Sequence, residues 1–159
     1  MKKLLFLASV VFLAASPSMA AAKHHHPVTK ANPQCVRTDK AQIATLFDRW
    51  NNSLRTGDAR KVAANYARDS VLLPTMSNRV RKTDGERIDY FEHFLKEHPV
   101  GHIDSRTIRV GCNDAIDTGV YTFTFADGKK VQARYTFTYV WDHKRWLISS
   151  HHSSLMPEK

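Results

Sequence analysis

Apolar residues recur at three- and four-residue steps from Thr38 onward, which is the spacing of an amphipathic helix. The first predicted helix begins at Thr38 or Asp39, either of which can cap it, and ends at Thr56-Gly57. Its apolar stripe consists of Ile43, Leu46, Phe47, Trp50 and Leu54. Because these side chains share one face, we expect the helix to pack against a larger layer.

Two more helices are predicted in the first part of the chain. Asp58 can cap a short helix whose apolar positions are Val62, Ala63 and Tyr66. A brief apolar run over residues 71–74 follows it. The third helix extends from about Asp84 to Glu97 and buries Ile88, Phe91, Phe94 and Leu95.

After Gly101 the periodicity changes from helical to alternating. Strands are predicted over residues 102–110, 119–125 and 131–141, and Asp127-Gly128 is a strong hairpin signal. The last two of these strands share one apolar side, made of Tyr121, Phe123, Phe125, Val131, Ala133, Tyr135, Phe137, Tyr139 and Trp141. Helices followed by a meander predict the α+β class, with N-terminal helices packed on one face of a curved antiparallel sheet.

The final predicted strand begins at Trp146 and changes character along its length. Strand side chains alternate with a period of two, so the side of Trp146 and Ile148 should also carry Ser150, His152 and Ser154. The inward face of this strand therefore starts apolar and becomes polar. This pattern predicts the floor of a cavity, with His152 as its titratable group.

The N-terminus has the features of an export signal. Lys2 and Lys3 precede an apolar run of about a dozen residues, and small residues follow around Ala20. The run is shorter than the ~20 residues that a membrane-spanning helix needs, so we expect no stable membrane insertion after cleavage. The predicted location is periplasmic or secreted. The predicted segments are a signal peptide over 1–22, a flexible leader over 23–35 and one domain over 36–159.

The chain has two cysteines, Cys35 and Cys112, and both follow the predicted signal peptide. An even number of cysteines in an exported protein suggests a disulfide, because such compartments are oxidising. A redox or metal-binding pair would need closer, Cys-x-x-Cys-like spacing. The sequence therefore predicts one structural disulfide between Cys35 and Cys112.

The formal net charge is +9, of which Lys2 and Lys3 supply two. This balance favours anionic ligands or surfaces. The basic residues are scattered, with a modest cluster at Arg79, Arg81, Lys82 and Arg87. No nucleic-acid-binding motif accompanies them, so no nucleic-acid partner is expected.

Five segments together resemble one protein family; they span residues 41–58, 66–74, 117–125, 133–139 and 146–154. The sequence resembles the bacterial branch of the calcium/calmodulin-dependent protein kinase II association-domain family. This family belongs to the nuclear transport factor 2-like superfamily, which also includes SnoaL-like and SgcJ/EcaC proteins. The resemblance covers roughly residues 36–158, most of the chain after the leader.

The resemblance implies a cone-shaped fold, self-association and a pocket between helices and sheet. It implies no kinase chemistry, because the chain has no Gly-rich nucleotide loop and no His-Arg-Asp motif. The kinase association domain has arginines on its pocket strands, whereas the matching positions here are Phe123 and Phe137. The candidate ligand-binding residues are Trp50, Tyr66, Tyr121, Phe123, Phe137, Tyr139, Ser150 and His152.

Proton transfer in a fold of this kind needs a base and a donor for a developing oxyanion. The predicted strands 119–125 and 131–141 contain no Asp or Glu, and Asp69 is expected to be a turn or capping residue. The candidate base is therefore His152, with Tyr121 or Tyr66 as donor. No cofactor is expected.

The histidines at 24–26 lie in the leader, and adjacent His151 and His152 should face opposite sides of a strand, so no zinc-like ligand set is expected. Arg134 lies opposite Phe137 by strand parity, which predicts that it faces outward or toward an oligomer partner.

Two functions agree with these observations. The first is an exported binding and assembly module, a homodimer or larger, with a pocket for a small organic ligand. The second is a small SnoaL-like enzyme, such as an isomerase, a dehydratase or an SgcJ/EcaC-type enzyme, with His152 as acid or base. The fold alone does not choose between them, because it carries many activities.

Overall fold

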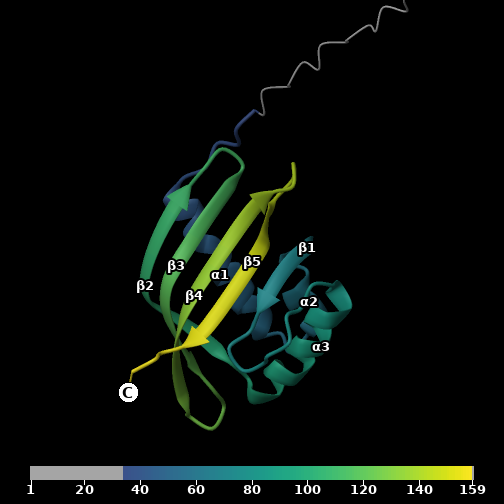
Figure 1. The fold of residues 1–159 in the computed structure, drawn as a ribbon, viewed down its shortest axis with the longest axis vertical. Coiled ribbons are helices and arrows are strands. Elements are labelled where there is room, and N and C mark those ends of the chain that lie inside the picture. Colours follow the sequence, from purple (N-terminus) through teal and green to yellow (C-terminus); the bar gives the residue numbers. More distant parts are fainter. Residues whose placement is uncertain (1–33, 159) are drawn as a thin grey trace, which may run out of the picture. The chain divides into compact units, whose positions relative to one another are not determined.

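The computed structural model describes residues 34–158 of the 159-residue chain. The predicted signal peptide and nearly all of the leader lie outside these residues. The helices come first and the sheet follows, as the periodicity predicted (Figure 1). In chain order the elements are α1 (Lys40–Leu54), α2 (Ala59–Ala63), β1 (Tyr66–Leu73), α3 (Asp84–Phe94), the 3-10 helix η1 (Leu95–Glu97), β2 (Val100–Val110), β3 (Asp114–Thr124), β4 (Lys130–Trp141) and β5 (Trp146–Leu155).

Each α-helix begins at a side chain that caps its free backbone N–H groups. The carboxylate of Asp39 accepts from the backbone N–H of Gln42 at 2.8 Å, and Asp58 does the same for Arg60 at 2.9 Å. In α3, Thr83 and Glu86 form a reciprocal capping box. The predicted cap residues of the first two helices are therefore confirmed.

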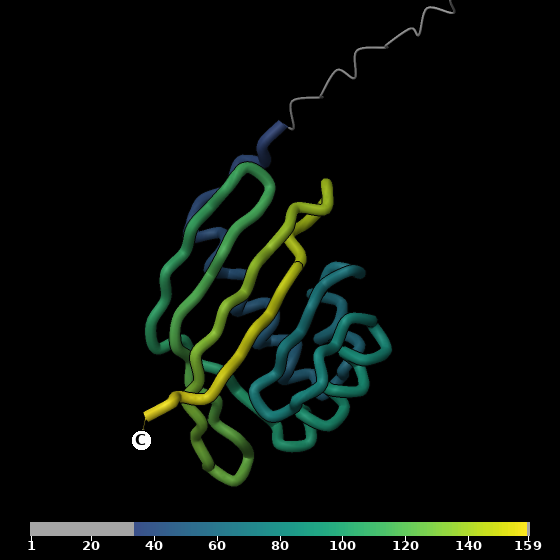
Figure 2. Tube along the Cα trace, in the orientation of Figure 1, coloured from purple at the N-terminus to yellow at the C-terminus, as the bar shows by residue number. Residues whose placement is uncertain are grey.

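The strands form one curved sheet in the order β1-β5-β4-β3-β2. The β2–β3, β3–β4 and β4–β5 pairs are antiparallel, and β1 pairs with β5 in parallel. The sheet is therefore mixed, with an antiparallel meander and one parallel edge strand. In the tube view, the four long strands run side by side while β1 lies at the edge next to α3 (Figure 2).

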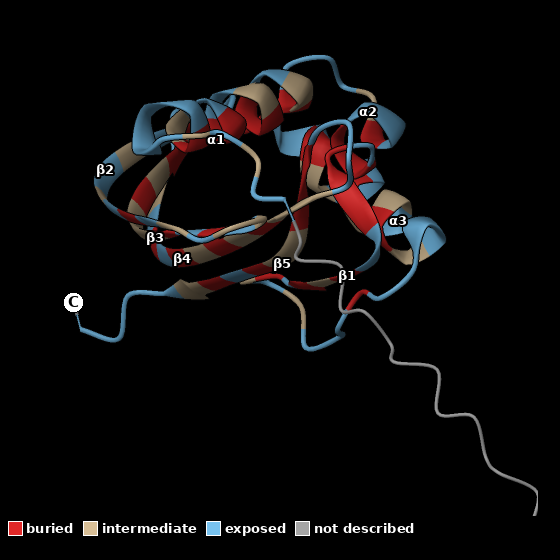
Figure 3. Cartoon of the chain, turned by 90° about the horizontal axis from the view of Figure 1, so that it is seen from above, coloured by how far each residue is buried: buried red, intermediate tan, exposed pale blue. Residues whose placement is uncertain are grey.

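The core lies between α1 and the inner face of the sheet (Figure 3). Trp50 is at its centre, 1 % exposed, with its ring edge-on to Phe137 at 5.5 Å between centroids. Gly101 brings β2 close to α1: a Cβ there would lie 3.1 Å from the Phe47 ring. Asn51 bonds both backbone groups of Gly101 at 2.8 Å, which fixes this close approach.

The final strand contains one extra residue, and this overturns part of the predicted alternation. Ile148 pairs with Tyr139 as expected, but the next partner on β4, Thr138, pairs with Ser150. Ser149 is thus a β-bulge, which shifts the alternation by one residue. His151, opposite Phe137, faces the core, and His152 faces outward. The prediction that Ser150, His152 and Ser154 share the side of Ile148 was wrong, because alternation is lost at the bulge.

Two element boundaries also differ from the sequence prediction. Tyr66 begins β1 instead of ending the second helix, because the Asn65 side-chain amide donates to the carbonyls of Lys61 and Val62 and closes α2. Asp69 consequently lies within β1, where it is exposed, and not at a turn. The third strand starts at Asp114, five residues before the predicted position 119.

The predicted disulfide is present between Cys35 and Cys112. It ties the segment before α1 to the hairpin between β2 and β3, across 77 residues of chain. Closing a loop of this size stabilises the fold by roughly 4 kcal/mol by the loop-entropy relation. Such bonds are typical of proteins in oxidising compartments.

Candidate functional site

A cavity of about 470 Å³ lies between the inner face of the sheet and α3. Most of its wall is apolar and aromatic, from Trp50, Phe91, Phe94, Phe123 and Phe125. Met76, in the loop after β1, also lines the cavity and is 79 % exposed, so the cavity reaches solvent. Three charged side chains also line it, namely Arg81, Glu97 and Lys129.

The polar groups of the cavity form one connected chain. Tyr66 Oη lies 2.9 Å from His151 Nδ1, and Tyr121 Oη lies 3.5 Å from His151 Nε2. Tyr121 also donates to Ser153 Oγ at 2.6 Å, and Ser153 is hydrogen-bonded to Thr75 Oγ1. His151, Tyr121, Ser153 and Thr75 line the cavity, while Tyr66 stands behind His151.

His151 is held as a neutral imidazole. Burial, with a smaller contribution from His152, lowers the pKa of His151 to about 3. The ring is 4 % exposed and stacks on Phe137 with 4.0 Å between centroids. At neutral pH the ring therefore has one proton on nitrogen, and it can donate through one nitrogen and accept through the other.

The two tyrosines beside His151 keep their protons. Burial raises the pKa of Tyr66 and that of Tyr121 well above the usual value for a phenol. The Tyr66 ring is held in place by Phe91 and by the Arg87 guanidinium, which lies 5.8 Å from its centroid. The hydroxyl and imidazole groups of this polar chain are thus neutral.

The predicted ligand-binding residues divide into three sets. Trp50, Tyr121 and Phe123 line the cavity. Tyr66 and Phe137 lie one layer behind, in contact with His151. The remaining three lie elsewhere: Tyr139 is in the core, and Ser150 and His152 are beyond the bulge on the other face.

A second, shallower groove of about 500 Å³ lies on the outer face of the sheet. His152, Arg134 and Ser154 line it, together with Thr118 and Thr136. Arg134 is exposed, as strand parity predicted. His152 and Tyr121 are therefore on opposite faces of the sheet, and they cannot act together on one ligand within a protomer.

Sequence reasoning missed His151, Ser153 and Thr75 as a group. Nothing in the sequence Ser149-Ser150-His151-His152 shows where a bulge occurs, so strand alternation assigned the wrong histidine to the inner face. Thr75 lies in a loop, where no periodicity applies. The doubled histidine was the one usable signal, since one member of an adjacent pair must face inward.

Sequence reasoning also missed an acid on the inner face of the sheet. Asp117 is fully buried in β3, accepts from Tyr135 Oη at 2.9 Å and pairs with Arg106 at 3.0 Å. Burial raises the pKa of Asp117, while Tyr135 and Arg106 oppose that shift. This ion pair is outside the cavity lining, and Asp117 contacts Arg106 and Tyr135 there, so it is a structural cluster.

Within residues 34–158, no group of three or more His, Cys, Asp and Glu side chains is placed to hold a metal ion. The same residues include no helix that is both long and apolar enough to cross a membrane.

Helices packed on a curved sheet of this order define the cystatin-like class, also called nuclear transport factor 2-like. A solved Nostoc punctiforme protein with a cystatin-like fold is 17% identical, covers 79% of this chain and 96% of its own, and has a TM-score of 0.66. The family follows from the sequence. The chain belongs to the calcium/calmodulin dependent protein kinase II association domain family, whose model matches residues 39–157.

Two other solved structures are similar to this chain. A Xanthomonas campestris protein assigned to the same association domain is 49% identical, with a TM-score of 0.74, over 77% of this chain and 91% of that one. A cyanobacterial iota-carbonic anhydrase, solved with bicarbonate, is 19% identical, with a TM-score of 0.68, over 79% of this chain and 96% of that one. No protein with a curated function matches the chain significantly.

Proposed function

We propose that the protein is an exported, homo-oligomeric association-domain protein that binds a small oxygen-bearing molecule in its cavity. The observation that carries the proposal is the chain of buried hydroxyl and imidazole groups on the wall of a mostly apolar cavity. Small-molecule sites have this composition, with an apolar wall for burial and a few polar groups for orientation. Trp50 and Phe123 form the wall, and Tyr121, His151 and Ser153 orient the ligand.

The polar chain of the site favours a ligand that accepts hydrogen bonds and that does not require a buried cation as its partner. The groups of the polar chain are neutral, and Arg81 and Lys129 are charged residues that also line the cavity. Arg81 is already paired with Asp89 at 2.7 Å. A small carboxylate or bicarbonate therefore fits this arrangement better than a large multiply charged anion.

Binding of acetate and bicarbonate, followed by NMR chemical-shift titration, tests this proposal. Replacement of Ser153 by Ala removes one polar contact and should weaken binding about tenfold, the effect of losing one hydrogen bond to a charged group. Ser154→Ala is the matched control, because Ser154 lies on the outer face. Equal affinities for the two variants would refute the assignment of this cavity.

A second candidate function is hydration of carbon dioxide. It is supported by the same neutral site and by the bicarbonate-bound carbonic anhydrase of the same fold. In this reaction water adds to carbon dioxide, bicarbonate forms and one proton leaves to buffer. The apolar wall would hold the gas, while Tyr121, His151 and Ser153 would stabilise the oxygens that gain negative charge.

Stopped-flow measurement of carbon dioxide hydration separates this enzyme from a binding module. The wild-type protein should accelerate hydration, Tyr121→Phe should lower the rate, and His152→Gln should leave it unchanged. Ligand binding without acceleration would support the binding module and eliminate the enzyme.

Two further parts of the proposal concern assembly and location. The family is an association domain, so self-assembly into a dimer or larger oligomer is proposed for this chain. Light scattering at micromolar concentration tests it, and a strict monomer would contradict it. Export is supported by the disulfide, and mass spectrometry of the N-terminus after expression would show whether residues 1–22 are removed.

A further inference from the structure

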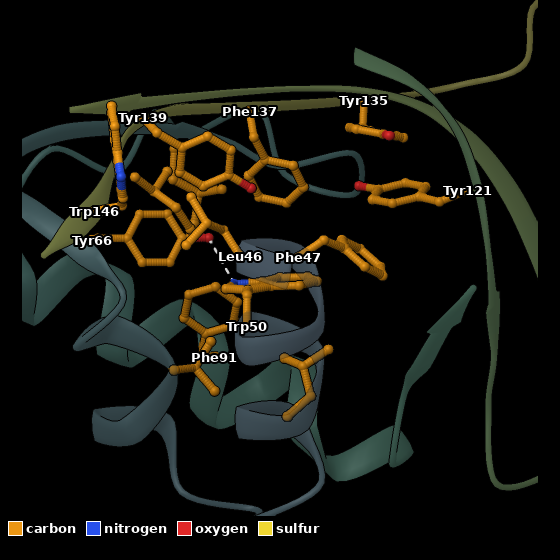
Figure 4. Close-up of a cluster of buried hydrophobic side chains, with 14 of the residues drawn as sticks. Leu46, Phe47, Trp50, Tyr66, Phe91, Tyr121, Tyr135, Phe137, Tyr139 and Trp146 are labelled. Atoms are coloured by element: carbon orange, nitrogen blue, oxygen red, sulfur yellow. Dashed lines mark hydrogen bonds between the residues drawn. The ribbon is translucent and has the colours of Figure 1, made fainter. Parts of the chain in front are cut away.

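The direction of the polar chain can be worked out from its first member. An indole nitrogen is a donor only, and Trp50 Nε1 donates to Tyr66 Oη at 3.1 Å (Figure 4, dashed line). Tyr66 has one hydroxyl hydrogen to donate. Among residues 34–158, the only other polar contact of Tyr66 Oη in this network is His151 Nδ1, at 2.9 Å. Tyr66 therefore donates to Nδ1, and this nitrogen is an acceptor.

We propose that the indole N–H of Trp50 fixes the direction of the whole chain, so that His151 is held as the Nε2–H tautomer and the chain offers a hydrogen to the cavity. Trp50 is then a positioning residue, which acts through Tyr66. This inference rests on the proposed ligand site and specifies the class of group that the site recognises.

The hydrogen-bond donors and acceptors beyond the imidazole follow in the same way. His151 Nε2–H points to Tyr121 Oη at 3.5 Å, and Tyr121 donates its own hydrogen to Ser153 Oγ at 2.6 Å. Ser153 and Thr75 are bonded to each other and hold two hydroxyl hydrogens between them. Their mutual bond uses one of the two hydrogens. The other is left for the cavity, which both residues line.

The leftover hydrogen defines the complementary ligand. A ligand group beside Ser153 and Thr75 must accept a hydrogen bond from this pair, as the oxygen of a carboxylate or of bicarbonate does. An ammonium group has only donors, so it would leave this hydrogen without an acceptor. Burial of the site strengthens the preference for an acceptor over an ammonium group, because an unpaired polar group costs more free energy in a buried site than in water.

The tautomer can be measured directly in the ligand-free protein. Long-range proton–nitrogen NMR correlations distinguish the protonated from the unprotonated nitrogen of each imidazole. For His151 in the wild-type protein at neutral pH, we expect Nε2 protonated and Nδ1 unprotonated. A ring protonated at Nδ1 would overturn the inference, whatever the protein binds.

Variants test whether Trp50 sets that tautomer. Trp50→Phe keeps an aromatic ring but removes the N–H, which allows Tyr66 to accept from Nδ1–H, so the two tautomers should mix. Tyr66→Phe is a second route, because it removes the donor to Nδ1 with little loss of volume. Tyr139→Phe is the matched control: within residues 34–158, the buried Tyr139 hydroxyl has no hydrogen-bond partner. An unchanged pure Nε2–H ring in both Trp50→Phe and Tyr66→Phe would refute the role of Trp50.

Binding gives a readout that separates this inference from the proposed function. Acetate should bind the wild-type protein and the Tyr139→Phe variant equally, and should bind Tyr66→Phe several-fold more weakly. Methylammonium should not bind in the cavity. Tighter binding of methylammonium than of acetate would overturn the inferred direction. An Nε2–H ring with no binding of acetate or bicarbonate would refute the proposed function and leave the direction of the chain established.

Discussion

The two faces of β5 carry nearly the same chemistry in different surroundings. His151 and Ser153 face the cavity, and their neighbours His152 and Ser154 face the outer groove. His151 is 4 % exposed, whereas His152 is exposed. The side-chain types are identical, so the difference in their properties comes entirely from the face on which each one lies.

Burial gives the inner pair its special properties. The inner histidine loses most of its hydration, so its neutral form is favoured and it must find hydrogen-bond partners inside the protein. Tyr66 and Tyr121 supply them. The outer histidine is hydrated by solvent and needs no such partners. Residue identity alone therefore does not define a site.

The largest expected difference between the faces is in stability. His151→Ala removes a buried ring stacked on Phe137 and leaves Tyr66 without its acceptor, which should cost about 3 kcal/mol, as for other buried ring deletions. His152→Ala should change the free energy of unfolding by no more than about 0.5 kcal/mol, as at other surface sites. Urea unfolding of both variants measures the difference. Similar costs for the two would show that the faces are wrongly assigned.

The contributions of His151 and His152 to the pH dependence of stability should also differ. The folded-state pKa of His151 is about 3, below its ordinary value of 6.5, so the unfolded chain binds the proton more tightly. Its contribution to stability is complete above pH 6.5 and falls as the pH drops toward 3, by up to about 1.4 kcal/mol per pH unit. Unfolding curves at about pH 7.5, 6 and 5 should show this slope. His151→Gln should flatten the slope, and His152→Gln should retain it; a slope unaffected by His151→Gln would contradict the assignment.

The smallest perturbation is chemical labelling of the intact protein. Diethyl pyrocarbonate reacts with accessible neutral imidazole, so His152 should be modified early and His151 late. Peptide mass spectrometry resolves the two sites when fragmentation separates them. Faster labelling of His151 would mean that the cavity is far more open than its burial indicates.

The features that depend on local pattern were predictable from the sequence. The apolar stripe of α1 and the caps Asp39 and Asp58 follow from periodicity and side-chain chemistry, and the structure contains them. The inward residues of β4, such as Phe137 and Tyr139, follow from alternation. The fold class and the disulfide could be predicted for the same reason, because each rests on many residues or on a simple count.

The features that depend on tertiary contacts were not predictable. The bulge at Ser149 shifts the pairing of β5 with β4 by one residue, and no local sequence signal marks it. Asp117 interrupted the apolar pattern of β3, although Arg106 and Tyr135 on neighbouring strands satisfy it. Tyr66 joined a strand because β5 pairs with it from a distance of more than eighty residues. Each miss comes from a partner that is remote in sequence.

The extra serine in β5 also determines where this strand can be shortened. Deleting Ser149 would restore regular pairing, with Ser150 still opposite Thr138 and His151 still opposite Phe137. In this chain the residue is therefore a spacer, and its loss should leave His151 as the histidine that faces the cavity. Deletion of Ser149 should therefore leave the inward face of β5 unchanged.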